Sequence, residues 1–358
     1  MSDPPDGLWR GFDAVGFDLD GVIYRGPDPV PGAPEAINEM HRQGARIGFV
    51  TNNAQRPPQV VADQLRQFGI DCGADDIVTS AQATARLMAQ SLPQKSEVLI
   101  VGSPALADEV ANVGLTPAAH RSPDTAALIV GYYEKLTWEQ LNQACYAIQH
   151  GAAYYACNDD LTRPTEQGLA IGMGAVLVAI AQPLPNNRPI IGGKPARPLL
   201  DETQRRLGCT HPLFVGDRLD TDIEGAFNAG WASLFVLSGG HGPSDLVAAP
   251  PHQRPDFLAA DVAGLLQPPR VASPDGSAWR CGDAVAAAVF VSEADPTPQT
   301  GVGRFIVQIE GPLENTEQRL DALWAAANAA WEWLDRDATV DATRALDRIG
   351  SFTPGVAG

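Results

Sequence analysis

Two aspartates, two residues apart, follow a short apolar run near the N-terminus. The apolar residues 14–17 lead directly into Asp18-Leu19-Asp20-Gly21-Val22. Ligands of open α/β sheets bind at the carboxyl ends of the strands, so an acidic pair placed there could serve a ligand. Two neighbouring carboxylates repel each other, and a shared cation or proton relieves that repulsion. The alternative is a strand cap followed by a turn, because Asp and Gly both favour turns.

Three further polar clusters follow predicted strands or lead into predicted helices. They are Thr51-Asn52-Asn53, Lys194 within Gly193-Lys194-Pro195, and Asp217 together with Asp222. Mg²⁺ prefers oxygen ligands such as carboxylates, whereas a phosphate binds to hydroxyls, backbone amides and positive charge. One carboxylate can attack phosphorus as a nucleophile, and a second carboxyl can protonate the leaving alkoxide. The four clusters therefore contain the groups that magnesium-assisted phosphoryl transfer requires.

Each of these clusters also has a purely structural interpretation. Thr51-Asn52-Asn53 could be a plain turn at a strand end, and Lys194 could be a solvated loop residue. Asp217 and Asp222 could flank and cap the following helix. The joint occurrence of the four clusters in one chain favours the functional interpretation.

The elements that must position these residues alternate between strand and helix patterns. This alternation predicts a parallel sheet with helices on both faces, that is, an α/β fold. We expect strands at residues 14–17, 46–50, 98–101, 127–130, 212–215 and 232–236. We expect helices at residues 33–43, 57–67, 138–149, 174–181, 199–207 and 223–229.

A proline-rich segment over residues 250–276 separates this pattern from a C-terminal region. The dipeptide Pro268-Pro269 places a domain boundary near residue 270. Beyond it we expect strands at 284–291 and 304–310 and an amphipathic helix at 316–334. Apolar side chains that recur at helical spacing predict its buried stripe: Leu320, Leu323, Trp324, Ala327, Trp331 and Leu334.

Composition limits the compartment and the partners. The chain has 358 residues, which favours two or three domains, and a formal net charge of -18. Such a charge disfavours nucleic acid and anionic membranes as partners. Five scattered cysteines without a CxxC pair predict neither disulfides nor a zinc site, which favours the cytoplasm. The longest apolar run, residues 172–181, is too short to span a membrane, and no signal peptide is expected.

In their order along the chain, the four clusters resemble the four motifs of the haloacid dehalogenase superfamily. Around them, Asp20-Gly21-Val22-Ile23-Tyr24, Pro31-Gly32-Ala33 and Gly216-Asp217-Arg218-Leu219-Asp220-Thr221-Asp222-Ile223 resemble one subgroup. These are the phosphatases with a large inserted α/β cap, which include phosphoglycolate, pyridoxal phosphate and glycerol phosphate phosphatases. The resemblance covers about residues 10–265. It implies a Rossmann-like parallel-sheet core at 10–82 and 188–265 and an α/β cap at 83–187.

The resemblance also implies a role for each motif residue. Asp18 would be the nucleophile and a metal ligand, and Asp20 the general acid and base, binding the metal through its backbone carbonyl. Thr51 and Asn52, with Asn53 beside them, would hold the phosphoryl oxygens, and Lys194 would neutralise the phosphate and orient Asp18. Asp217 would complete the metal site, and Asp222 would support it without touching the metal. The implied cofactor is Mg²⁺, for which Mn²⁺ or Co²⁺ could substitute.

Asp20 and the cap bear on reaction and substrate. True dehalogenases of the superfamily lack the second aspartate, so Asp20 favours phosphate esters. Cap residues around Asn158 and Arg163 are candidates for contacting the substrate, although Arg163 could equally be a structural arginine. Related caps commonly read Asn-Pro-Asp there, and this chain has Asp159 in place of the proline.

Residues 271–358 resemble a degenerate acetyltransferase-like domain appended to some bacterial glycerol 3-phosphate phosphatases, which makes a small C-terminal α+β domain. The segment Gln299-Thr300-Gly301-Val302-Gly303 is one residue short of the coenzyme A-binding pattern, so we expect no acetyl transfer. A role in homo-oligomer formation, through this domain or the cap, or in regulation is the better hypothesis.

These observations predict a Mg²⁺-dependent phosphomonoester hydrolase that acts on a small phosphorylated metabolite. The resemblance of the C-terminal region favours glycerol 3-phosphate, with phosphoglycolate or another small phosphate ester as the alternative. A hypothesis of a different class is a sensing or assembly protein with incidental phosphatase activity.

Overall fold

The computed structural model describes residues 7–165, 167–184, 186–292 and 303–352. The chain divides into two units. The first unit comprises Met1–Arg25, Pro29–Ala45 and His211–Gly358, and the second comprises Gly26–Asp28 and Arg46–Thr210.

Four parallel strands form the sheet of the first unit, in the order β15 (Phe257–Ala259), β14 (Ala232–Val236), β13 (Pro212–Gly216) and β1 (Ala14–Phe17). All residues of β1 and β13 are buried, as are most of β14. Strands covered on both faces are almost entirely apolar, which is why 14–17 and 212–215 were recognisable from the sequence. The elements that surround them are η1 (Leu8–Gly11), β2 (Tyr24–Arg25), β3 (Asp28–Pro29), α1 (Ala33–Arg42), η3 (Leu219–Ile223), α8 (Glu224–Ala229), α9 (Pro243–Val247), η4 (Pro251–Gln253) and η5 (Val262–Leu266).

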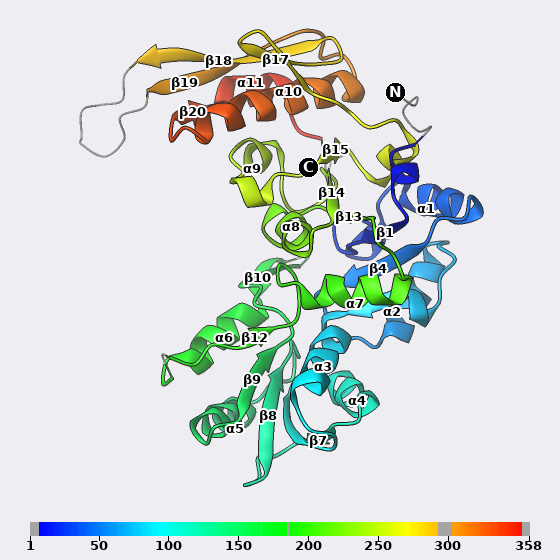
Figure 1. The fold of residues 1–358 in the computed structure, drawn as a ribbon, viewed down its shortest axis with the longest axis vertical. Coiled ribbons are helices and arrows are strands. Elements are labelled where there is room, and N and C mark those ends of the chain that lie inside the picture. Colours follow the sequence, from blue (N-terminus) through cyan, green and yellow to red (C-terminus); the bar gives the residue numbers. More distant parts are fainter. Residues whose placement is uncertain (1–6, 166, 185, 293–302, 353–358) are drawn as a thin grey trace. The chain divides into compact units, whose positions relative to one another are not determined.

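The C-terminal part of the same unit is a second, five-stranded sheet covered by helices (Figure 1). Its strand order is β16 (Ser273–Asp275), β17 (Ala278–Cys281), β18 (Ala284–Ser292), β19 (Arg304–Glu310) and β20 (Thr339–Asp341). Neighbouring strands are antiparallel except β19 and β20. The helices are α10 (Thr316–Leu334) and α11 (Thr343–Ile349).

The second unit contains a five-stranded parallel sheet with helices on both faces. Its order is β12 (Ile190–Ile191), β9 (Ala153–Ala156), β8 (Thr125–Val130), β6 (Glu97–Val101) and β7 (Thr116–Ala118). Alternate strand residues pack on opposite faces: Val98 and Ile100 lie against α3 (Ser80–Ser91) and α4 (Pro104–Asn112). Leu99 and Val101 lie against α5 (Trp138–Gln149) and α6 (Met173–Ala181). This is the period of two that a strand imposes on its side chains.

The remaining elements of the second unit lie outside this sheet. Strand β4 (Ile47–Thr51) pairs in parallel with β5 (Ile77–Thr79). Strands β10 (Thr162–Thr165) and β11 (Gly168–Ile171) form an antiparallel pair. The helices are α2 (Pro58–Gln67), η2 (Ala74–Asp76) and α7 (Pro198–Leu207).

The expected fold class is confirmed: parallel sheets with flanking helices, followed by a small C-terminal sheet with two helices. Helices 138–149 and 316–334 occur at the expected bounds. The helix expected at 223–229 instead begins at Glu224, because a π-helical turn, Leu219–Ile223, precedes it. Strand β15 was missed, because three apolar residues among prolines carry too little periodicity to be recognised. Residues 299–302 of the segment compared with the coenzyme A-binding pattern lie outside the described residues.

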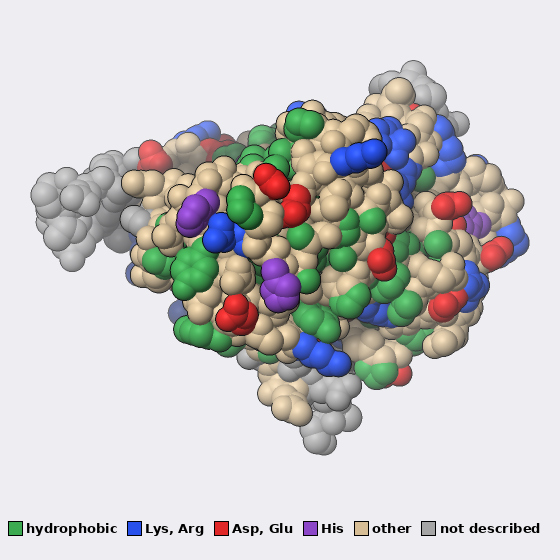
Figure 2. Space-filling view, turned by 90° about the horizontal axis from the view of Figure 1, so that it is seen from below, with side chains coloured by type: hydrophobic (Ala, Val, Ile, Leu, Met, Phe, Trp, Pro, Cys, Tyr) green, Lys and Arg blue, Asp and Glu red, His purple; other side chains and the backbone are tan. Residues whose placement is uncertain are grey.

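Among the described residues, none of the helices has both the length and the apolar character needed to cross a bilayer. On the face drawn in Figure 2, acidic and basic side chains are interspersed rather than separated by sign. The net charge of -18 is therefore not gathered into one acidic field on that face.

Candidate active site

Three carboxylates of the first unit form a cluster. Asp18 follows β1, Asp217 follows β13, and Asp222 lies in the π-helical turn that comes next. One carboxylate oxygen from each of the three lies within 4.8 Å of the other two. The pairing of β1 with β13 explains part of this, because Phe17 and Val215 are partners and the next residues leave the sheet at the same edge. Asp217 and Asp222 are buried, and Asp18 is half-buried.

The π-helical turn brings Asp222 back to the end of β13. Its Oδ2 accepts hydrogen bonds from the backbone amides of Asp217, at 3.2 Å, and Arg218, at 3.1 Å. Gly216 permits this approach, since a Cβ there would lie 2.1 Å from the Asp222 Cβ. Asp222 thus fixes the backbone that carries Asp217 and also presents its own carboxylate to the cluster.

A glycine-rich loop after β14, residues 238–242, encloses Asp217. The Gly240 amide donates to Asp217 Oδ2, and the His241 amide donates to the Asp217 carbonyl at 3.1 Å. His241 Nδ1 accepts from the Leu219 amide at 2.9 Å. Sequence reasoning missed this loop, although Ser-Gly-Gly-His-Gly directly after a predicted strand was a usable signal.

Two glycines make room for the Asp217 carboxylate. A Cβ on Gly239 would lie 1.9 Å from Asp217 Oδ2, and one on Gly21 would lie 2.2 Å from the same atom. Gly21 also has a φ of +89°, which disfavours any other residue. The loop and the Asp18–Asp20 turn are linked, because Ser238 Oγ donates to the Gly21 carbonyl at 2.7 Å.

Asp20 lies on the turn beside this cluster and is exposed. It forms a β-bridge with Tyr24, and the Gly21 amide donates to the Tyr24 carbonyl at 2.7 Å. Among the described residues, the group of mutually close carboxylates contains Asp222 and not the side chain of Asp20. A backbone-carbonyl role for Asp20 is independent of where its side chain lies.

In the second unit, Asn52 is the centre of a polar network. Asn52 and Lys194 bond reciprocally: the Lys194 amide donates to Asn52 Oδ1 at 2.8 Å, and Asn52 Nδ2 donates to the Lys194 carbonyl at 3.0 Å. The Asn52 carbonyl accepts from Ser80 Oγ at 2.7 Å and from Asn158 Nδ2 at 2.8 Å. Asn52 Nδ2 also lies 3.2 Å from Asp160 Oδ2. The network fixes the backbone on which the predicted phosphate-binding residues lie.

Lys194 is only 1% exposed, which is unusual for a lysine unless it meets negative charge. Gly192 and Gly193 let the chain pass close to its neighbours there. A Cβ on Gly192 would lie 2.0 Å from Thr84 Oγ1, and one on Gly193 would lie 2.3 Å from the Cys157 carbonyl. This burial disfavours the interpretation of Lys194 as a solvated loop lysine.

The neighbouring Cys157 is a poor nucleophile. Complete burial raises the pKa of its thiol to about 12, although a hydrogen bond with Thr84 acts in the opposite direction. The thiol is therefore neutral near pH 7, and covalent chemistry through a thiolate is disfavoured.

The remaining predicted site residues make local contacts. Thr51 is buried, and its Oγ1 accepts from the Asn53 amide at 3.1 Å; Asn53 is exposed and its Oδ1 accepts from the Gln55 amide. Asn158 Oδ1 accepts from the Asp160 amide at 3.3 Å, so the segment with Asp159 in place of proline forms a side-chain-stabilised turn. Arg163 lies over the Tyr132 ring at 4.8 Å and 3.9 Å from Glu134.

The carboxylate cluster has the composition of a site for a hard divalent cation. Asp18, Asp217 and Asp222 offer only oxygen atoms, and their mutual distances allow one ion to be shared. Three carboxylates this close would repel strongly without a cation or protons between them. The residues present therefore fit Mg²⁺ better than a soft metal, which would call for Cys or His.

Two family models match this chain. A model described as haloacid dehalogenase-like hydrolase matches residues 15–116, and one described as HAD-hydrolase-like matches residues 191–265. These two stretches contain Asp18 and Thr51 in the first and Lys194 and Asp217 in the second.

Curated relatives and solved structures agree with these models. D-glycerol 3-phosphate phosphatase of Mycobacterium tuberculosis is 41% identical over 71% of this chain and 71% of its own. Glycerol-3-phosphate phosphatase of Homo sapiens is 32% identical over 72% of this chain and 91% of its own. A crystal structure of a glycerol phosphate phosphatase from Mycobacterium tuberculosis in complex with magnesium superposes with a TM-score of 0.80. It is 33% identical and covers 96% of this chain and 98% of its own. The p-nitrophenyl phosphatase from Archaeoglobus fulgidus is 27% identical, with a TM-score of 0.65 over 71% of this chain and 98% of its own.

Proposed function

We propose that this chain, which belongs to the haloacid dehalogenase-like hydrolases and is a phosphatase of that family, is a Mg²⁺-dependent glycerol 3-phosphate phosphatase. The observation that carries the proposal is the cluster of Asp18, Asp217 and Asp222, in which Asp18 and Asp217 directly follow adjacent parallel strands. Mg²⁺ held by this cluster would neutralise charge on the phosphate, and Mn²⁺ or Co²⁺ could replace it.

The proposed reaction has two steps at phosphorus. A carboxylate oxygen of Asp18 forms a bond to phosphorus while the bond to the substrate's ester oxygen breaks, and Asp20 gives its proton to the leaving alkoxide. Asp20 then takes a proton from a water molecule whose oxygen attacks the phosphorus of the aspartyl-phosphate. The bond between Asp18 and phosphorus breaks in the same step. The products are an alcohol and inorganic phosphate. The exposure of Asp20 leaves its carboxyl accessible to both proton transfers.

The residues of the second unit are proposed to bind the phosphate and the rest of the substrate. Thr51 and the Asn52–Asn53 segment would donate hydrogen bonds to phosphoryl oxygens, and Lys194 would supply positive charge. Asn158 supports this segment through its hydrogen bond to Asn52. We also propose a substrate contact for Arg163, whose guanidinium lies over the Tyr132 ring and near Glu134.

The choice of glycerol 3-phosphate is supported by two relatives, from Mycobacterium tuberculosis and Homo sapiens, that carry this activity in their names. Phosphoglycolate and other small phosphate esters are the alternatives, because the same machinery would serve them. A panel of phosphorylated metabolites, assayed with Mg²⁺ for release of inorganic phosphate, discriminates between them. We expect the highest kcat/KM with glycerol 3-phosphate; a rank among the poorest substrates would refute the narrower assignment.

The covalent step is tested by Asp18→Asn, which keeps the size of the side chain and removes its nucleophilic charge. We expect turnover to fall by more than about a thousandfold, the scale of losing a nucleophile. Acid-quenched wild-type protein should carry alkali-labile phosphate and the variant none, while circular dichroism shows an unchanged fold. Retained turnover, or phosphate still trapped on the variant, would exclude Asp18 as the nucleophile.

The wider organisation is part of the same proposal. We propose the discontinuous core at 10–82 and 188–265, the cap at 83–187 and the C-terminal domain at 271–358, with homo-oligomer formation through the cap or that domain. A cytoplasmic location is supported by five free cysteines. A sensing or assembly role with incidental catalysis would be favoured instead if no panel substrate exceeded the rate with p-nitrophenyl phosphate.

A further inference from the structure

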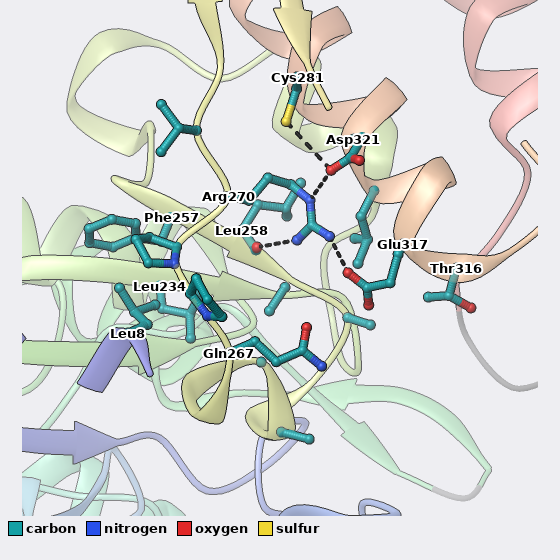
Figure 3. A pocket seen from close by; sticks show the side chains of 18 of the residues that line it. Leu8, Leu234, Phe257, Leu258, Gln267, Arg270, Cys281, Thr316, Glu317 and Asp321 are labelled. Atoms are coloured by element: carbon teal, nitrogen blue, oxygen red, sulfur yellow. Dashed lines mark hydrogen bonds and ion pairs between the residues drawn. The ribbon is translucent and has the colours of Figure 1, made fainter. Parts of the chain in front are cut away.

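The long helix α10 of the C-terminal region is fastened to the parallel sheet of the first unit near its N-terminal end. Arg270, whose side chain is 13% exposed, pairs with Asp321 at 2.7 Å and with Glu317, both on α10. The same guanidinium donates to the Leu258 carbonyl of β15 at 3.4 Å. Figure 3 shows Arg270 between β15 and α10, where it lines a cavity of about 460 Å³. One side chain therefore links the parallel sheet to helix α10.

A second link lies at the C-terminal end of α10. The Trp331 indole nitrogen donates to the Leu246 carbonyl of α9 at 3.0 Å, and both residues are buried. Arg254 donates two hydrogen bonds to Asp335, at 2.7 and 2.8 Å, lies over the Trp331 ring at 5.2 Å and donates to the Ala249 carbonyl. Bidentate contacts of this kind fix direction as well as distance.

The second link involves α9, which follows the loop that bonds Asp217 of the carboxylate cluster. Helix α9 begins at Pro243, immediately after the loop 238–242 that bonds both the side chain and the backbone of Asp217. Leu219 and Ile223, from the turn that carries Asp222, belong to the same apolar cluster as Trp324 and Trp331. The loop 238–242 thus leads into a helix that contacts α10, and the π-helical turn shares an apolar cluster with α10.

We infer that Trp331 is a positioning residue for the metal site. Its hydrogen bond to Leu246 fixes α9, and α9 in turn fixes the loop 238–242 that orients Asp217. In this way the C-terminal region increases the affinity of the site for its metal ion. The inference rests on the proposed metal site. It requires no ligand of the C-terminal region and no catalytic group within it. Without the Trp331–Leu246 hydrogen bond, the Gly240 and His241 amides can adopt more orientations. Asp217 is then less pre-organised and binds the metal ion more weakly.

The test is Trp331→Phe in the full-length protein, which keeps an aromatic ring in the apolar cluster and removes the N–H donor. Trp324→Phe is the matched control, because Trp324 lies on the same helix, is similarly buried and packs edge-to-face on the Trp331 ring at 5.5 Å. This variant disturbs the packing around Trp331 but leaves its N–H donor to Leu246 in place. Binding of Mn²⁺ is measured without substrate by electron paramagnetic resonance, and Tm is measured for each protein. We expect Trp331→Phe to raise the Kd for Mn²⁺ at least threefold. We also expect its turnover to recover at saturating metal.

The control separates positioning from general loss of packing. Trp324→Phe should lower Tm to a similar extent while its Kd for Mn²⁺ stays within the error of the wild-type value. If both variants raise the Kd for Mn²⁺ equally, or if Trp331→Phe leaves it unchanged, the positioning role of Trp331 is refuted. If the wild-type protein itself binds no Mn²⁺ or Mg²⁺, the proposed metal site fails, which is a distinct result.

Discussion

At the scale of single residues, the space that the Asp217 carboxylate occupies restricts the neighbouring residues more than its charge does. Asp217 Oδ2 accepts a hydrogen bond from the Gly240 amide. It also lies beside Gly21 and Gly239, where any Cβ would collide with it. A carboxylate confined in this way is pre-organised to hold a cation. The glycines, and not only the aspartates, are therefore part of the proposed site.

Gly239→Ala tests this confinement. Its Cβ would be built 1.9 Å from Asp217 Oδ2, so the carboxylate must move, and we expect a loss of Mg²⁺ affinity of more than about tenfold, the scale of disturbing groups that orient a metal ligand. Gly240→Ala is the control, because its Cβ would meet atoms no closer than 3.3 Å. Calorimetric titration of both variants with Mg²⁺ decides the matter. Equal affinities would show that Asp217 tolerates displacement.

Asp222 shows what a motif alone leaves open. Its resemblance to the family motif implies that it supports the metal site without touching the metal, and its two hydrogen bonds to backbone amides fit that role. The structure also places its carboxylate in the cluster, because the π-helical turn Leu219–Ile223 carries it back toward β13. A five-residue separation does not specify that turn.

At the scale of elements, helix α10 shows why some predictions were accurate. Asn315 caps it, accepting from the Gln318 amide at 2.9 Å, and its apolar stripe has regular helical spacing. The cap marks where the helix begins, and the stripe shows how far it extends. What α10 packs against was not readable, because Trp331 contacts a residue 85 positions earlier in the chain.

The pair of Arg254 and Asp335 makes the attachment of α10 dependent on pH. The hydrogen bonds from Arg254 hold the pKa of the Asp335 carboxyl below its ordinary value. The pair therefore stabilises the fold above the unfolded-state pKa of about 3.9, and this stability is lost as the pH falls through the lower folded-state pKa. Asp335 is 47% exposed, so we expect the difference from Asp335→Asn to be at most about 1 kcal/mol.

Urea unfolding of the wild-type protein and of Asp335→Asn at several pH values measures this difference. It should be largest near neutral pH and shrink toward zero as the pH falls from about 3.9 through the lower folded-state pKa, below which Asp335 is protonated in both states. A difference that stays constant over that range would show that the pair contributes through packing rather than charge.

At the scale of the whole molecule, the C-terminal region and part of the phosphatase belong to one structural unit. Residues 211–358 lie in one unit, and one apolar cluster joins Leu246 and Leu258 with Leu323 and Trp331. The C-terminal region therefore covers apolar surface of this unit that would otherwise face water.

A chain that ends at residue 268 tests this continuity. We expect its Tm to fall by more than about 5 °C, since losing several buried apolar contacts costs several kcal/mol. It should also bind the dye ANS, whereas the full-length protein should not. Full stability of the shortened chain, with unchanged assembly and metal affinity, would show that the region is an independent appendage.

The sequence by itself determined the local part of this protein. Continuous apolar strands, capped amphipathic helices and four short polar motifs in order predicted an α/β phosphatase, because these signals depend on neighbours within a few residues. The tertiary structure alone decided which distant groups meet. It brought the loop 238–242 around Asp217, carried Asp222 to Asp18, and placed Trp331 on Leu246. Such contacts depend on strand order and packing between segments far apart in the chain, and no local pattern encodes them.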